Sequence, residues 1–305
     1  MAWILNYITT LTLITHLLSL EGKVEMEVNK IYNMDCLDGL RMLESGCIDL
    51  TVTSPPYDNL RTYDGHIKQW TFDKFKEIGK ELFRVTKPGG VVVWVVADQT
   101  KNGTESGTSF RQALYFKECG FNLHDTMVWL KDGGGAVGSN KCYTQNFEYM
   151  FVFSKGIPKA INLIYDKPNL SYGIDKSGIG RRKISGEKKV ETRKPARKFS
   201  RRNNWWYIPP QKGKEHPAVF PEQLANDHIL SWSNPGDLVL DPFMGSGTTA
   251  KMAFLNKRNY LGFEISEEYC EIAEEKIEQA KTSYKKGCIA GGLDDTDEHK
   301  QLQYC

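Results

Sequence analysis

The sequence predicts an α/β protein built on a mostly parallel β-sheet with helices on both faces. Strand-like and helix-like segments alternate along most of its 305 residues, which is the order that parallel strands with crossover helices require. The run VVVWVVA at 91–97 is apolar without interruption, as expected for a strand covered on both faces. The composition, with 40% hydrophobic and 26% charged residues, is ordinary for a globular protein.

The individual elements follow from periodicity and from their boundaries. Phe72, Phe75, Ile78 and Leu82 recur near a 3.6-residue period, which predicts an amphipathic helix. Gly120 ends a second helical segment. The segments expected as strands are, in order, 29–36, 47–54, 91–97, 121–131, 146–156, 236–241 and 259–265, and those expected as helices are 37–45, 71–86, 109–120, 221–233, 250–258 and 266–286.

The α/β pattern is interrupted once and extended at both ends. Residues 26–154 and 205–286 are expected to form one catalytic domain, with a polar insertion at 155–204 and a flexible tail at 287–305. The first 20 residues of the N-terminal extension, 1–25, are mostly apolar and carry no Lys or Arg, so the basic region of a signal peptide is missing. A dispensable extension or added helix is favoured over a membrane segment, because Asn6, His16 and four threonines interrupt the apolar run.

Cysteine usage and net charge exclude some classes of protein. The seven cysteines contain no C-x-x-C pair, so neither a zinc site nor a disulfide framework is expected and the thiols should be reduced. The net charge of +2 does not by itself indicate a nucleic-acid partner. The insertion does, because between Lys176 and Arg202 twelve Lys or Arg residues stand against only Glu187 and Glu191. A solvated charged loop is the alternative.

A glycine turn at 245–247 predicts a cofactor site. The segment LVLDPFMGSGTTAKMAF reads as strand, Gly-x-Gly turn and helix, so Gly245 and Gly247 would let the backbone approach a ligand at a helix N-terminus. Glu264 ends the next strand, 19 residues after Gly245, a spacing at which an acid reaches ribose hydroxyls. A third glycine and a Gly-Lys-Ser/Thr sequence are both missing, which favours a nucleoside cofactor without phosphates. A purely structural turn is the alternative.

The stretch TSPPY at 53–57 predicts a site for an amine. The two prolines have fixed φ angles and no N–H, so they present carbonyl oxygens without competing donors. Ser54 adds a hydroxyl acceptor, and Tyr57 adds a flat face on which a heterocycle can stack. Acceptors out of the ring plane favour a tetrahedral nitrogen whose lone pair can attack a methyl donor. A rigid surface turn is the alternative.

Together the two motifs resemble those of the S-adenosylmethionine-dependent DNA amino-methyltransferases. TSPPY matches that family's (Ser/Asp/Asn)-Pro-Pro-(Tyr/Phe/Trp) motif, and DPFMGSGTT matches its Phe-x-Gly-x-Gly motif. The catalytic motif comes first, which resembles the permuted β-class order. The resemblance covers about residues 28–283 and implies a Rossmann-like methyltransferase fold with a seven-stranded sheet. It also implies that the target base is flipped out of the duplex, because a paired amine is inaccessible to a cofactor in a pocket.

The resemblance also implies which residues bind S-adenosylmethionine. NMDCLDGL resembles the segment whose acid contacts the cofactor adenine, and HPAVFPEQL resembles the segment that packs around the methionine end. The residues expected to bind the cofactor are Asp35, His216, Pro217, Phe220, Asp241, Pro242, Phe243, Gly245, Ser246, Gly247, Thr248 and Glu264. No metal is expected.

The target base is expected to be cytosine, methylated at N4. The family tends to have Ser at the first motif position for N4-cytosine, and Asp or Asn for N6-adenine, so Ser54 favours cytosine and leaves adenine as the alternative. Asp98 follows a strand and is a candidate acceptor for the proton that the alkylated amine loses, with a helix-capping role as the alternative. The catalytic candidates are Ser54, Pro55, Pro56, Tyr57 and Asp98.

Double-stranded DNA is the expected partner, and the insertion lies where this family places target recognition. The residues expected to contact DNA are Arg61, Arg193, Lys194, Arg197, Lys198, Arg201 and Arg202. A restriction endonuclease partner, a monomer or homodimer, and a cytoplasmic, nucleoid-associated location (nuclear in a eukaryotic host) are further expectations. An inactive DNA-binding relative is the non-enzymatic alternative. Trp205 and Trp206 are expected to pack in the core, and no role is assigned to His124 or His228.

Overall fold

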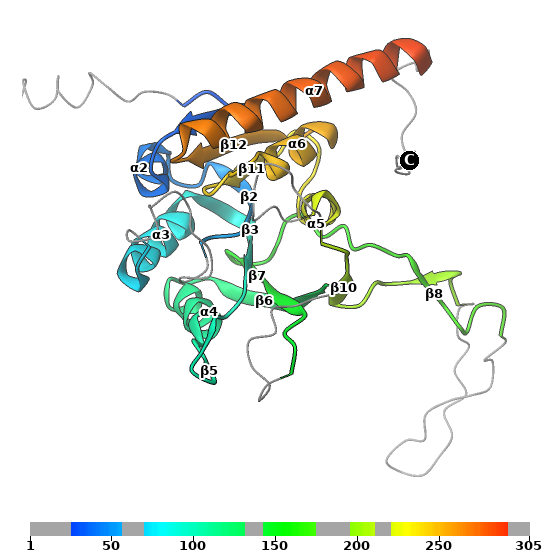
Figure 1. Ribbon diagram of the computed structural model, residues 1–305. Helices are drawn as coiled ribbons and strands as arrows, with labels where there is room; N and C mark the ends of the chain where they lie inside the picture. The colour runs from blue at the N-terminus through cyan, green and yellow to red at the C-terminus, as the bar shows by residue number, and fades with distance from the viewer. Residues whose placement is uncertain (1–25, 57–69, 132–142, 175–195, 211–220, 292–305) are drawn as a thin grey trace, which may run out of the picture.

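The structure, a computed structural model of the chain, describes residues 26–56, 70–131, 143–174, 196–210 and 221–291 (Figure 1). The strands are β1 (Lys30–Asn33), β2 (Ile48–Thr53), β3 (Thr86–Val96), β4 (Thr100–Lys101), β5 (Thr104–Glu105), β6 (Asn122–Leu130), β7 (Phe147–Ser154), β8 (Lys167–Pro168), β9 (Phe199–Ser200), β10 (Trp205–Tyr207), β11 (Leu238–Asp241) and β12 (Asn259–Glu264). The helices are α2 (Cys36–Met42), α3 (Phe72–Val85), α4 (Thr108–Glu118), α5 (Glu222–Trp232), α6 (Thr248–Leu255) and α7 (Glu267–Gly291).

The main sheet has the order β1-β12-β11-β2-β3-β7-β6-β10. All neighbouring strands are parallel except β7, which runs antiparallel to both β3 and β6. The predicted α/β class and mostly parallel sheet are therefore confirmed. The sheet has one strand more than the seven expected, because Trp205–Tyr207 pairs with Val128–Leu130 of β6.

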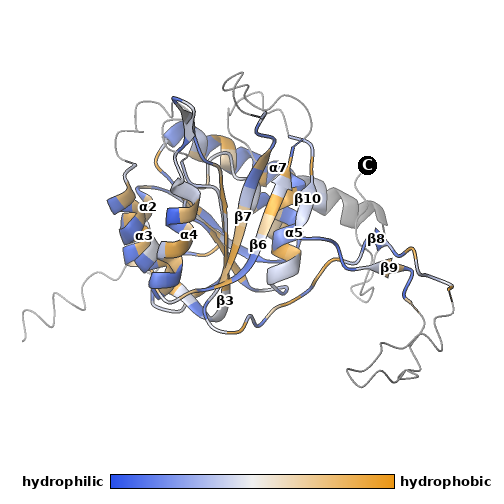
Figure 2. Ribbon diagram, turned by 90° about the horizontal axis from the view of Figure 1, so that it is seen from below, coloured by the Kyte–Doolittle hydropathy of each residue, from blue (hydrophilic) through white to orange (hydrophobic). Residues whose placement is uncertain are grey.

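Helices cover both faces of this sheet, as the sequence predicts. Figures 1 and 2 show α2, α3 and α4 on one side of it and α5, α6 and α7 on the other. The central strand β3 serves both layers: Val92, Trp94 and Val96 belong to one buried cluster, and the alternate residues of this strand belong to the other. The uninterrupted apolar run therefore reflects burial on two faces.

The amphipathic helix α3 shows how the sequence sets one of these layers. Phe75, Ile78 and Leu82 are completely buried, at the helical spacing that predicted the element. Thr71 caps its first turn by accepting a hydrogen bond of 3.1 Å from the backbone N–H of Lys74. Lys74, in this first turn, also forms an ion pair with Asp35, which follows β1, so the N-terminal end of α3 lies beside that segment.

The insertion, residues 155–204, is only partly described, and its described segments carry the short strand pair β8 and β9. Figure 1 shows this pair extending away from the main sheet. Trp206, directly after the insertion, is 5% exposed and packs in the core as expected, whereas Trp205 is half exposed. At the other end of the chain, α7 runs to Gly291, beyond its expected end at residue 286. No helix in the described ranges is long and apolar enough to span a membrane.

Candidate functional site

Both sequence motifs lie at one edge of the sheet, formed by the carboxyl ends of its parallel strands. Asn33 pairs with Glu264, Gly262 with Asp241, and Thr53 with Trp94. The loops that follow β1, β12, β11, β2 and β3 therefore leave the sheet at the same edge. Ligands of open α/β sheets bind at this edge, so the register places both motifs where a shared site would be built.

The Ser-Pro-Pro segment continues directly from β2. Thr53 is the last strand residue, Ser54 is partly exposed, and Pro55 is buried. The prolines restrict the backbone where it leaves the sheet. Ser54 is therefore presented at the edge by a rigid connection. Tyr57 lies outside the described residues.

A buried carboxylate connects this segment to the glycine turn. Thr53 donates its hydroxyl to Asp241 Oδ1 at 2.6 Å, and Thr249 donates its hydroxyl to Asp241 Oδ2 at 2.8 Å. The backbone N–H of Phe243 also donates to Oδ1, at 3.0 Å. Asp241 is only 1% exposed, so its role in the structure is to hold the end of β2 against the start of α6. The predicted cofactor contact of Asp241 stays a prediction.

Burial raises the pKa of Asp241 to about 6, against the opposing effect of the three hydrogen bonds. The carboxyl group of Asp241 therefore binds its proton more tightly in the native state than in the unfolded chain. Its contribution to stability is present below pH 4 and is lost as the pH rises through about 6.

We expect the variant Asp241→Asn to lose this pH dependence. Its amide oxygen can still accept from Thr53 and Phe243, and its NH₂ can donate to the Thr249 hydroxyl, so the variant should fold. Urea unfolding should show the free energy of unfolding of the wild type falling relative to the variant by up to about 3 kcal/mol between pH 4 and pH 7. Parallel pH profiles for the two proteins would contradict this result.

The glycine turn between β11 and α6 depends on two positive φ angles. Gly245 has φ +51° and Gly247 has φ +80°. A Cβ at Gly247 would lie 2.8 Å from the Cβ of Ala273 in α7, so the turn packs against that helix without room for a side chain. Lys276, one turn further along α7, donates a 2.9 Å hydrogen bond to Ser246 Oγ. The sequence predicted the turn but not this contact with α7.

Glu264, at the end of β12, also contacts the glycine turn. Its Oε2 accepts a hydrogen bond of 2.7 Å from the N–H of Gly245, and its Oε1 accepts one of 2.9 Å from the N–H of Ser266. These two bonds hold the carboxylate beside the turn, where the ribose of a nucleoside would approach it. The 19-residue spacing read from the sequence thus corresponds to a direct contact between the acid and the turn.

Asp35 stands at the start of α2, after β1. Its side chain accepts a 2.9 Å hydrogen bond from the N–H of Leu37 and forms a 2.6 Å ion pair with Lys74 of α3. Both side chains of the ion pair are about one-quarter exposed, at 24% for Asp35 and 23% for Lys74. Lys74 was not predicted as a site residue, because its sequence position places it only on a helix.

Aromatic side chains lie beside the turn. The rings of Phe243 and Trp70 meet edge to face with centroids 5.4 Å apart, and Phe243 also contacts Trp94 at 6.1 Å. Such a wall offers an apolar surface to a planar group. Phe243 was expected at the site, but Trp70 was not, since nothing in its local sequence connects it to the turn.

Asp98 makes the contacts of a helix-capping residue. It is 3% exposed and accepts 3.0 Å hydrogen bonds from the N–H of Ser109 and the hydroxyl of Ser106, and another from the Ser109 hydroxyl. These bonds satisfy donors at the start of α4. The capping alternative thus describes its observed contacts, and its role as a proton acceptor stays a prediction.

The basic residues of the insertion differ in their surroundings. Arg202 forms ion pairs with Asp166 and, at 2.6 Å, with Asp227, and it lies 5.2 Å from the ring centre of Trp206. Arg202 therefore fixes the insertion to α5, a different role from the predicted DNA contact. Arg197 and Lys198 lie over exposed aromatic rings. Several expected residues lie outside the described ranges: Tyr57, Arg61, Arg193, Lys194, His216, Pro217 and Phe220.

The glycine turn, the carboxylates and the aromatic rings at this edge fit a nucleoside cofactor. The Gly245–Gly247 turn allows close backbone approach, and Glu264 and Asp35 supply carboxylates at the ends of neighbouring strands. Phe243 and Trp70 supply an apolar wall. Within the described residues, no group of three or more His, Cys, Asp or Glu side chains is arranged to hold a metal ion.

Comparison with known proteins identifies the family. The model of the N6/N4 methyltransferase family, described as DNA methylase, matches residues 48–275. The chain belongs to this DNA methylase family. An orphan methyltransferase, M.BamHII of Bacillus amyloliquefaciens, is 55% identical over 249 residues, which cover 78% of this chain and 92% of that protein. The DNA adenine methyltransferase YhdJ of Escherichia coli (strain K12) is 28% identical over 267 residues, which cover 83% and 84%.

Solved structures share the fold of this DNA methylase. PvuII DNA methyltransferase, which is cytosine-N4-specific, superposes with a TM-score of 0.59 at 22% identity and covers 86% of this chain and 93% of that one. The putative DNA modification methylase TTHA0409 of Thermus thermophilus, complexed with S-adenosyl-L-methionine, gives 0.56 at 24% identity and covers 82% and 95%. The expected family and fold are thus confirmed, the cofactor is S-adenosylmethionine, and the substrate is DNA.

Proposed function

We propose that this DNA methylase transfers the methyl group of S-adenosylmethionine to the exocyclic N4 amine of a cytosine in double-stranded DNA. The observation that carries the choice of base is Ser54, the first residue of the Ser-Pro-Pro segment, which lies at the end of β2. Its position is fixed by the neighbouring Thr53, whose hydroxyl is bound by Asp241. A serine at this position is typical of N4-cytosine enzymes.

The proposed mechanism uses acceptors rather than a covalent intermediate. The bound cofactor supplies an electrophilic sulfonium methyl group. The Ser54 hydroxyl and the Pro55 carbonyl accept hydrogen bonds from the two amine hydrogens, which favours a tetrahedral nitrogen with its lone pair available. Tyr57 stacks on the extrahelical base. The methyl carbon bonds to the nitrogen as its bond to sulfur breaks, with the sulfur keeping the electron pair. Positive charge develops on the nitrogen during the transfer, so acceptors held at this edge stabilise the transition state more than the substrate. The methylated nitrogen then loses one proton to solvent.

N6-adenine methylation is the second candidate. It is favoured by the similarity to a relative that is itself named a DNA adenine methyltransferase. The same acceptors would hold the adenine amine, since both bases present an exocyclic NH₂ group. A catalytically inactive DNA-binding relative is disfavoured by the intact Gly245–Gly247 turn and its contact with Glu264.

The choice of base is tested by nucleoside mass spectrometry. Mixed-sequence duplex DNA is incubated with the protein and S-adenosylmethionine and then digested to nucleosides. We expect N4-methylcytosine as the methylated product. N6-methyladenine as the sole product would refute the cytosine assignment and leave the amino-methyltransferase proposal intact, whereas an unmethylated digest would refute both.

The remaining expectations on partners stay predictions. One relative is named an orphan methyltransferase and others are named type II methyltransferases, so a cognate restriction endonuclease is a prediction to be tested separately. A monomeric or homodimeric state and a cytoplasmic, nucleoid-associated location are predictions of the same kind.

A further inference from the structure

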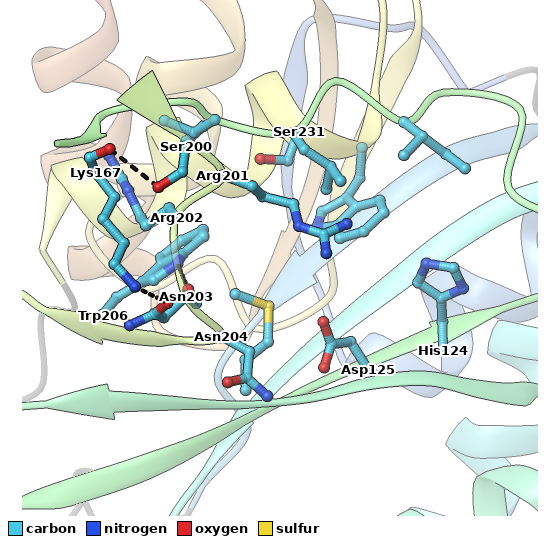
Figure 3. Close-up of a pocket in the computed structure, with 15 residues that line it drawn as sticks. His124, Asp125, Lys167, Ser200, Arg201, Arg202, Asn203, Asn204, Trp206 and Ser231 are labelled. Carbon is cyan, nitrogen blue, oxygen red and sulfur yellow. Dashed lines mark hydrogen bonds between the residues drawn. The ribbon is translucent and has the colours of Figure 1, made fainter. Parts of the chain in front are cut away.

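A pocket of about 640 Å³ lies beneath the insertion, apart from the motif loops (Figure 3). Its walls come from the amino-terminal half of β6, the C-terminal end of α5 and the two described segments of the insertion. Asp125 in this wall pairs through Val152 with Val93 of β3, three positions before Val96 ends that strand. The pocket is therefore set back along the strands from the edge that carries the Ser-Pro-Pro segment.

Two charged groups that line this pocket have no partner within the described residues. The guanidinium of Arg201 and the carboxylate of Asp125 form neither a hydrogen bond nor an ion pair there, and Figure 3 shows both side chains directed toward the same space. Trp232, which is only 5% exposed, lies beside them, and its indole N–H has no acceptor among the residues that the structure describes. The charges of Arg201 and Asp125 are therefore available to a ligand in this space.

The walls around these groups are firmly held. Arg202 connects Asp166 of the insertion to Asp227 of α5. Trp206 contacts Arg202 at 5.2 Å from its ring centre and the ring of His228 at 4.5 Å between centroids. The contacts of Arg202 and Trp206 thus connect the insertion to the domain. The side chain of Arg201 faces the pocket instead.

The unpartnered groups define the chemistry of the ligand. A guanidinium favours a phosphate or carboxylate, and Lys167, which donates to Asn203 at 2.9 Å, adds a second cation to the pocket lining. Asp125 would repel a plain anion and requires a donor such as an amine. A ligand that satisfies both has an anionic group and an NH₂ group. The volume lies in the range of small-molecule sites.

We propose that this pocket binds one nucleotide that carries an exocyclic amine, with its phosphate at Arg201 and Lys167 and its amine at Asp125. The nucleotide is either a unit of the bound DNA or a free mononucleotide. Binding of a nucleotide of the DNA rests on the proposed function, whereas binding of a free mononucleotide does not. Cytosine, adenine and guanine carry the amine, and thymine does not.

The variant Asp125→Asn separates this proposal from simple electrostatic attraction. If the pocket attracted only phosphate, removal of a negative charge would strengthen binding. If Asp125 accepts from a base amine, the neutral variant loses a charge-assisted hydrogen bond and binds more weakly. We expect affinity to fall about fivefold in Asp125→Asn and about tenfold in Arg201→Ala. Lys159→Ala, which removes an exposed charge of the insertion outside the pocket, is the matched control and should change affinity less than about threefold.

The experiment measures binding of two probes to the full chain with S-adenosylmethionine present. Calorimetry compares dCMP with dTMP, and fluorescence anisotropy measures a labelled mixed-sequence duplex at fixed salt. Preferential dCMP binding that both pocket variants weaken identifies a free nucleotide. Weaker duplex binding in both variants, without binding of dCMP, identifies a nucleotide of the DNA.

Wild-type affinity in both variants for both probes would overturn the proposal, as would stronger duplex binding by Asp125→Asn. Methyl transfer by the wild type is measured in parallel. Normal transfer together with unchanged pocket variants would refute only the nucleotide pocket, whereas absent transfer would refute the proposed function.

Discussion

Replacement of Gly247 by alanine is expected to destabilise the protein and abolish binding of S-adenosylmethionine. The backbone at this position has φ +80°, which costs a side chain about 1–2 kcal/mol. The new Cβ would also lie 2.8 Å from the Cβ and 3.0 Å from the Cα of Ala273. Overpacking of this kind costs about 1–3 kcal/mol. The free energy of unfolding should therefore fall by roughly 2–5 kcal/mol, measured by urea denaturation, with cofactor binding measured by calorimetry.

Gly236→Ala is the matched control for this variant. Gly236 has φ +88°, but no atom of the described residues would lie within 4 Å of a Cβ there. The control should show only the backbone cost of about 1–2 kcal/mol and should bind the cofactor normally. Equal destabilisation by the two substitutions, or normal cofactor binding by Gly247→Ala, would contradict the role assigned to the packing of the turn against α7.

Replacement of Ser54 by alanine is expected to lower kcat while leaving cofactor affinity unchanged. The lost hydrogen bond is made to an amine that becomes charged during transfer, and such bonds contribute about 1.5–3 kcal/mol. The rate constant should therefore fall roughly 10- to 150-fold, with kcat and kcat/KM reduced alike. Steady-state kinetics on duplex DNA measure both parameters.

Ser45→Ala controls for the loss of a serine hydroxyl elsewhere. Ser45 is exposed, and its hydroxyl accepts a 3.2 Å hydrogen bond from Arg84. This variant should keep its kcat, and thermal unfolding should show that both serine variants are folded. A Ser54→Ala enzyme with an undiminished rate would remove the hydroxyl from the mechanism.

The fold and both motifs could be predicted because their signals are local. The period of Phe75, Ile78 and Leu82 follows from α3 alone, and the Gly-x-Gly turn with Glu264 follows from one βαβ unit. The short β10 was not predicted, because a three-residue strand after a polar insertion has no periodicity to detect.

The contacts that complete the site depend on tertiary structure. The bond from Thr53 to Asp241 joins positions 188 residues apart, and neither residue type indicates the other. Lys74 and Trp70 reach the edge only because α3 begins there. The pocket at Arg201 and Asp125 likewise requires the insertion to fold back on β6. Asp98 was predicted as a proton acceptor from its position at the end of a strand, but its observed contacts are those of a helix cap.

We propose that the edge with Ser54 and the Gly245–Gly247 turn forms one site for methyl transfer from S-adenosylmethionine to DNA. The most direct test follows transfer of a radiolabelled methyl group to mixed-sequence duplex DNA by the wild type and by Ser54→Ala, with cofactor affinity measured for both. We predict that the wild type labels the DNA, and that the variant binds the cofactor equally but labels the DNA far more slowly. An unlabelled DNA with the wild type, or equal labelling by both proteins, would contradict the claim.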